Sequence, residues 1–176
     1  LAKEGTNVIV TVDCGIANAK ALDLAHDLGM GVVICDHHQL APEIPKHAFI
    51  VHPLAPGETY PNKSLCGTGV AFKFAWAMFD GARERGADIP EGREKWLMDL
   101  VAIATVTDVM PLIGENRALE KFGLKTLNKT RRPGLIALIE QSRCELGSID
   151  TQAIGYRIGP RINAAGRVAS AQEAFK

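Results

Sequence analysis

The chain has 176 residues, no formal net charge and 47% hydrophobic residues with few aromatics. This length suits one domain, or one domain and part of another, and the composition is typical of a globular protein with a sizeable core. No run approaches the ~18 consecutive apolar residues of a membrane span, and no charged-then-apolar leader opens the chain. We therefore expect no membrane-spanning segment in this chain.

The zero net charge conceals an uneven distribution of charge along the chain. Residues 1–116 carry 9 Lys and Arg against 15 Asp and Glu, whereas residues 117–176 carry 11 against 5. An acidic part followed by a basic part is typical of a metal-dependent enzyme that acts on a polyanion. Solvated helix faces produce the same division, so the pattern supports this function without establishing it.

The cysteines are widely spaced and form no C-x-x-C pair. There are four of them, Cys14, Cys35, Cys66 and Cys144. This spacing favours neither a zinc ribbon nor a dense disulfide framework. We expect reduced thiols in a cytoplasmic protein, with packing in the core as their default role.

Two short β-branched runs in the first 35 residues predict parallel strands. The runs are Val8–Val12 and Val32–Cys35, and residues 17–28 between them repeat apolar residues with a helical period. A strand-helix-strand unit of this length makes the strands parallel, so that their carboxyl ends meet at one edge of the sheet. Asp13 follows the first strand and Asp36-His37-His38 follow the second. We expect these side chains to meet at the edge where open α/β sheets hold ligands.

Asp36, His37 and His38 are the strongest metal-ligand candidates from residues alone, because two adjacent imidazoles after a carboxylate are unusual at the end of a buried strand. Carboxylates with an imidazole form a mixed, mostly hard ligand set that Mn²⁺ accepts. The alternative is that polar residues merely cap the strand. For Asp13 the alternative is a helix N-cap, which is compatible with a metal role for the same carboxylate.

The remainder of the chain predicts one more strand and a series of helices. A third parallel strand is expected at 48–51, flanked by His47 and His52, both interpreted as structural, and a surface loop at 53–66. Helices are expected at 70–82, 94–105, 116–127 and 131–141, with a short helical segment at 150–156. The glycines of Gly67-Thr68-Gly69 suit either a phosphate or close packing of the first helix. The predicted fold is α/β, a parallel sheet flanked by helices.

Two further segments carry candidate functional residues. Asp108 follows a nearly all-apolar helix; burial of an unpaired carboxylate is costly, so either a cation in the same cleft or an exposed helix end would account for it. Arg161, Asn163 and Arg167 lie among Gly, Ala and Pro residues within 157–167. Small residues permit close backbone approach, and Arg binds phosphate oxygens in a bidentate manner, which favours an anion-binding element. The alternative is a surface turn with exposed arginines.

With segments 12–15, 36–38, 107–112 and 160–167 in this order, the chain resembles the DHH phosphoesterase superfamily and, within it, the RecJ family of single-strand-specific exonucleases. The resemblance extends from residue 8 to about 170. It implies a metal-dependent phosphodiesterase that degrades single-stranded DNA from 5′ to 3′ in DNA repair and recombination. Its cofactor would be a pair of Mn²⁺ or Mg²⁺ ions, which stabilise the attacking and leaving oxygens of an in-line displacement at phosphorus.

The resemblance also assigns roles to individual residues. Asp13 matches the carboxylate that bridges both ions, and His37 and Asp108 match ligands of one of them. Asp36 and His38 match motif residues that orient the site and contact the phosphate. All five are therefore expected to be catalytic.

The Arg-rich motif matches residues that hold DNA phosphates near the active site, here Arg161, Asn163 and Arg167. We expect a DHH domain at 1–128 and a helical connector at 129–176. The family's Asp-x-Asp motif is expected upstream of Leu1 and its second small domain beyond Lys176. The chain is thus interpreted as an internal fragment with an incomplete two-metal site, inactive by itself.

Two alternative functions stay open at this point. One is a different DHH enzyme, acting on pyrophosphate or on short or cyclic oligonucleotides. The other is a catalytically inert module that binds nucleic acid through its basic part. Protein partners and oligomeric state are not predicted.

Overall fold

The computed structural model describes the backbone of residues 1–168 and the side chains of residues 1–164. The chain divides into two compact units, Leu1–Pro90 and Glu91–Lys176. Among the described residues, no helix is both long and apolar enough to cross a membrane. The expected functional boundary at residue 128 stays a prediction.

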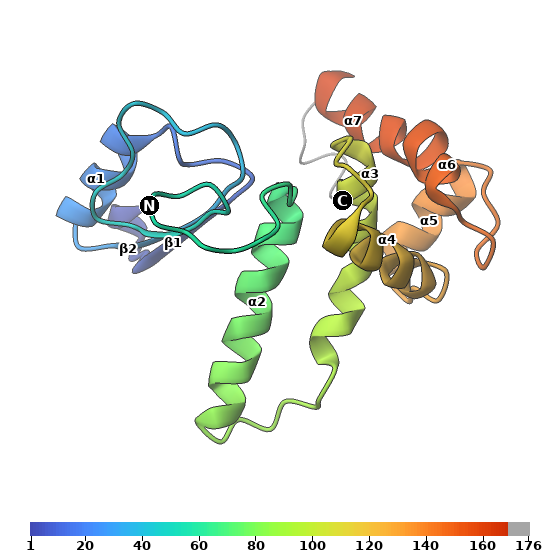
Figure 1. The fold of residues 1–176 in the computed structure, drawn as a ribbon, viewed down its shortest axis with the longest axis horizontal. Helices are drawn as coiled ribbons and strands as arrows, with labels where there is room; N and C mark the ends of the chain where they lie inside the picture. The colour runs from blue at the N-terminus through green and yellow to red at the C-terminus, as the bar shows by residue number, and fades with distance from the viewer. Residues whose placement is uncertain (169–176) are drawn as a thin grey trace. The chain divides into compact units, whose positions relative to one another are not determined.

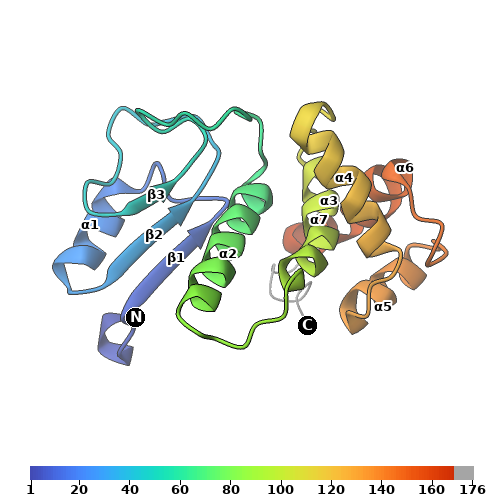
Figure 2. The ribbon, with the colours of Figure 1, turned by 60° about the horizontal axis from the view of Figure 1, so that its bottom comes forward.

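The first unit is built on a three-stranded parallel sheet in the order β1-β2-β3 (Figures 1 and 2). The strands are β1 Val8–Val12, β2 Gly31–Cys35 and β3 Phe49–Val51, preceded by a short 3₁₀ helix, η1 Ala2–Glu4. Val12 is in register with Cys35, and Cys35 with Val51, so all three strands end at the same level. The predicted strands and their parallel pairing are confirmed.

Two helices accompany this sheet, α1 Ala19–Asp27 and α2 Gly67–Glu84. On α1, Leu22 and Ala25 are buried against Val32 and Ile34, alternate residues of β2 that share one face. In sequence, α1 joins β1 to β2, as the apolar period predicted. Helix α2 contacts all three strands. It begins three residues before the predicted start.

In the second unit, every regular element among the described residues is a helix (Figure 2). Its elements are η2 Arg93–Leu97, α3 Met98–Thr107, α4 Gly114–Leu127, α5 Pro133–Gln141, α6 Thr151–Ala153, η3 Ile154–Ile158 and α7 Gly159–Val168. The prediction of one helix over 94–105 is wrong in its first turn, which is 3₁₀-helical until Leu97. The alternative of a surface turn for 157–167 is also wrong, since this segment is helical.

Close helix contacts and an ion pair to a buried carboxylate stabilise the second unit. A Cβ on Gly123 of α4 would collide with the Met98 carbonyl and the Ala102 methyl of α3, so glycine permits the two helices to approach. Asp99 of α3 is only 2% exposed, and its Oδ2 accepts hydrogen bonds from Arg132 Nε at 2.9 Å and from the Thr130 hydroxyl at 3.3 Å. The buried carboxylate therefore has partners that compensate its loss of water.

Candidate metal and phosphate site

Asp36, directly after β2, is a buried carboxylate with an organising role. Its side chain is 1% exposed, and its Oδ2 accepts a hydrogen bond from the Ile16 N–H at 3.0 Å. Its Oδ1 accepts from the N–H groups of His37 at 2.8 Å and His38 at 3.2 Å. Burial alone would raise the pKa of this carboxyl, but the hydrogen bonds from Ile16, His38 and His37 outweigh it and lower the pKa to about 2. Asp36 is therefore ionised at neutral pH and fixes the segments that follow β1 and β2.

The same carboxylate orients the ring of His38. Asp36 Oδ1 lies 2.7 Å from His38 Nδ1. Because an ionised carboxylate can only accept, Nδ1 carries the proton, and the lone pair of a neutral ring is left on Nε2. A carboxylate that holds one imidazole nitrogen while the other binds metal is the usual second-shell arrangement of metal-ligating histidines. The His38 side chain is 59% exposed.

Asp13 and His37 complete a three-residue cluster. Asp13 Oδ1 lies 3.1 Å from His37 Nε2, and one ligand atom each from Asp13, His37 and His38 lie within 4.8 Å of one another. The structure thus brings together the residues that parallel strands were predicted to deliver to one edge. Asp13 is not a helix cap, because α1 has Asn18 at its N-cap. The metal roles of these residues stay predictions, which this donor set supports.

Gly67, the first residue of α2, makes room for Asp13. A Cβ at this position would collide with the Asp13 carboxylate and its Cβ. Cys66 caps the helix, its Sγ accepting from the Gly69 N–H at 3.3 Å. The Gly67-Thr68-Gly69 turn therefore serves close packing, but the packing partner of Gly67 is the candidate ligand itself.

His52, the first residue after β3, supports the site in a way that sequence reasoning missed. It is 2% exposed, and its Nδ1 accepts from the Leu54 N–H at 3.0 Å. Its Nε2 lies 2.9 Å from the His38 carbonyl oxygen and therefore donates to it. Burial lowers the pKa of His52, which keeps the ring neutral in this role. Its place at the end of the third parallel strand was the available indication, since that strand also ends at the ligand edge.

No cysteine belongs to the cluster of Asp13, His37 and His38 among the described residues. None of the four cysteines, all within the described residues, forms a disulfide. Cys35 and Cys66 are buried, and burial raises the pKa of the Cys35 thiol. Cys14 is exposed, so the expectation of core packing is wrong for it.

Asp108 lies in the second unit, as the C-cap of α3. Its N–H donates to the Ala104 carbonyl at 2.9 Å, and the residue is exposed, which agrees with the helix-end alternative. The next residue, Val109, has a φ of 55° and is 86% exposed, so the chain turns sharply here. Participation of Asp108 in a metal site stays a prediction.

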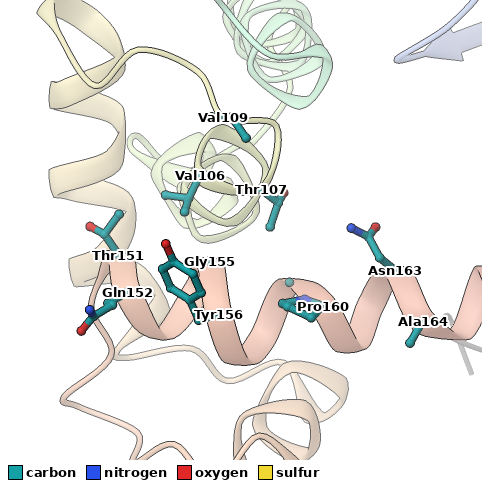
Figure 3. A pocket seen from close by; sticks show the side chains of 11 residues that line it. Val106, Thr107, Val109, Thr151, Gln152, Gly155, Tyr156, Pro160, Asn163 and Ala164 are labelled. Carbon is teal, nitrogen blue, oxygen red and sulfur yellow. The ribbon is translucent and has the colours of Figure 1, made fainter.

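The predicted phosphate-binding residues lie on α7. Arg161 and Asn163 are exposed, and Arg161 Nη1 donates to the Arg157 carbonyl at 2.6 Å. The side chain of Arg167 lies outside the described residues. Asn163 also lines a cavity of about 850 Å³ between the end of α3 and the η3–α7 segment (Figure 3).

Comparison with known proteins agrees with this arrangement. Residues 3–105 match the DHH family, N-terminal domain. The chain is 41% identical to the single-stranded-DNA-specific exonuclease RecJ of Bacillus subtilis, covering 99% of this chain and 21% of that protein. It is 37% identical to the RecJ of Escherichia coli, covering 93% and 29%. The chain therefore spans less than a third of these relatives.

Solved structures give the same result for the fold. A RecJ exonuclease bound to manganese superimposes with a TM-score of 0.81 at 35% identity, over 97% of this chain and 41% of that one. RecJ from Thermus thermophilus with Mn²⁺ gives a TM-score of 0.82 at 34% identity, over 97% and 24%. The predicted α/β fold class and the resemblance to the RecJ family are confirmed.

Proposed function

This chain belongs to the DHH family, and we propose that it is part of a metal-dependent exonuclease that hydrolyses phosphodiester bonds in single-stranded DNA. The observation that carries the proposal is the convergence of Asp13, His37 and His38 around a buried, ionised Asp36. The RecJ relatives, which are single-stranded-DNA-specific exonucleases, support the substrate.

The cluster suits a divalent ion, and RecJ structures contain Mn²⁺ or Mg²⁺. When bound, a pair of such ions provides an activated water and stabilises charge on the reacting oxygens. In this chain Asp13, His37 and Asp108 are the residues that would hold these ions, as the resemblance to the family implies. Asp36 holds the His38 ring, which would contact the metal or the phosphate, and His52 holds the backbone of the same turn.

The basic part of the chain would bind the DNA backbone. Arg161 and Asn163 are exposed on α7, and Arg167 follows on the same helix. Phosphate contacts fix position without reading sequence, so activity should tolerate any sequence and fall with salt. The 5′→3′ direction, the role in repair and recombination and a cytoplasmic location belong to the same proposal.

The test is degradation of 5′-labelled single-stranded DNA by the full-length protein, with duplex DNA and pyrophosphate as parallel substrates. We expect loss of the single strand only, dependent on Mn²⁺ and abolished by His37→Ala. Hydrolysis of pyrophosphate or dinucleotides alone would move the function to small substrates. Equal degradation of DNA in EDTA would refute the metal mechanism.

A further inference from the structure

The cavity in the second unit lies between two segments whose close approach depends on Gly159. One is the end of α3, with Val106, Thr107 and Val109, and the other is η3–α7 (Figure 3). A Cβ on Gly159 would collide with the Thr107 methyl. The cavity volume of about 850 Å³ falls within the ~300–1,000 Å³ range of small-molecule pockets. Thr107 and Val109 flank Asp108, so the cavity adjoins the predicted metal-binding carboxylate.

Tyr156 supplies the aromatic ring of this cavity. It lies in η3, a π-helical turn, and such turns frequently mark functional sites. Ile154 and Ile158 on either side of it are 0% and 1% exposed and anchor the turn in the core. Tyr156 itself is 79% exposed and lines the cavity. The turn thus presents an aromatic ring to solvent on a rigid support.

Two amide side chains also line the cavity, on either side of Tyr156 along the helical segment. Gln152 lies to one side of Tyr156 and Asn163 beyond Pro160 on the other (Figure 3). Each amide can both donate and accept, so either one could pair with the edge of a base beside it. Arg157 and Arg161, on the same helical segment, are exposed cations suited to the adjoining phosphates.

We infer that this cavity is a subsite for one unpaired nucleobase of single-stranded DNA, with the Tyr156 ring as its stacking surface. The inference rests on the proposed function and deepens it. Base stacking on an aromatic side chain tolerates every base, because every base has a π-face. A base inside a duplex is already stacked and paired, so it cannot enter. The cavity would therefore contribute to discrimination between single and double strands.

The test measures binding of fluorescently labelled single-stranded DNA to the full-length protein in chelator, where no hydrolysis occurs. We expect Tyr156→Ala to weaken binding about tenfold, a loss typical of one stacked base, and Tyr156→Phe to bind as wild type. Tyr60→Ala, which removes the chain's other tyrosine, is the matched control and should change nothing. Wild-type affinity in Tyr156→Ala would overturn the inference.

A second arm separates stacking from a merely structural effect. Oligonucleotides with one abasic residue, moved stepwise from the 5′ end, should lose about tenfold affinity for wild type at a single position. At that position Tyr156→Ala should show no further loss, because deletion of the ring and deletion of the base remove the same stacking contact. Fully additive losses would refute the subsite. If wild type degrades single strands with Mn²⁺ yet shows no such position, only the subsite fails; if it degrades none, the proposed function fails as well.

Discussion

The two units hold their candidate functional residues in opposite ways. In the first unit, Asp36 and His52 are buried and fully engaged, and they orient the exposed ring and backbone of His38. In the second unit, Tyr156 of η3 and Arg161 of α7 are exposed. The buried residues of this helical segment, such as Ile154 and Ile158, anchor it in the core. A metal ion requires ligand atoms fixed in place, whereas a mobile polymer requires accessible surfaces. Substitutions at Asp36, His37 and His52 should therefore affect turnover and metal binding, and those at Tyr156 and Arg161 should affect DNA binding.

The largest expected effect is on turnover in His37→Ala. Removal of an imidazole that lies 3.1 Å from Asp13 takes away a predicted metal ligand. Because metal stabilisation is worth several kcal/mol, turnover should fall ~10³-fold or more. Measurement of hydrolysis at saturating DNA and of DNA affinity in chelator separates the two quantities.

In that experiment DNA affinity should stay close to wild type. A parallel loss of affinity and turnover would break the division between the units. Asp108→Ala belongs beside it, because unchanged turnover in that variant would remove Asp108 from the metal site.

Next in size is Asp36→Asn, which removes the charge but keeps the shape. Loss of a second-shell carboxylate typically costs ~10–100-fold in metal affinity. We expect this weakening in Mn²⁺ titrations followed by calorimetry. His38→Gln is the companion variant, and the effects of the two substitutions should not add, because both break the same pair.

The lowered pKa of Asp36 also predicts that the free energy of unfolding depends on pH. Its pKa is lowered from 3.8 to about 2 by folding, so its stabilisation is complete above pH 4 and is lost as pH falls towards 2. The shift corresponds to about 2 kcal/mol of unfolding free energy. Urea unfolding at pH 5 and pH 2.5 should show this loss in wild type, and a smaller one in Asp36→Asn. Equal pH dependence in both proteins would contradict the assignment.

A moderate effect is expected for His52→Ala. It leaves the His38 carbonyl and the Leu54 N–H without their buried partner, which should cost about 1–3 kcal/mol of unfolding free energy and weaken metal binding. His52→Gln retains a donor and an acceptor, so it should recover part of the metal affinity. A loss of stability with unchanged Mn²⁺ affinity would limit His52 to a structural role.

Much of the first unit was predictable because its signals are local. β-branched runs, a helical period and parallel pairing sufficed to place Asp13 beside His37 and His38. The roles of Gly67 and His52 were not predictable in this way, since each depends on a contact between segments far apart in sequence. A single residue at the start of a helix or directly after a strand carries no periodic pattern that would reveal its partner.

In the second unit the helix through Pro160 was not predicted. Residues 157–167 were expected to be an anion-binding element, with a surface turn as the alternative, and proline usually interrupts a helix interior because it lacks an N–H. In the structure the helical run continues through Pro160, and the π-helical turn η3 ends two residues before it, at Ile158. The same turn exposes Tyr156, which is why the stacking surface escaped notice in the sequence.

The smallest expected effect is that of Arg161→Ala on DNA affinity. Arg161 is exposed, and its one described hydrogen bond is to a carbonyl on its own helix, so stability should not change. Loss of one phosphate contact should weaken binding uniformly across sequences and reduce the slope of log affinity against log salt by about one. Arg131→Ala removes the same charge from another exposed position of the second unit and should leave the slope unchanged. Equal slopes for both variants would mean that the basic region attracts DNA only through its summed charge, and that α7 presents no defined phosphate site.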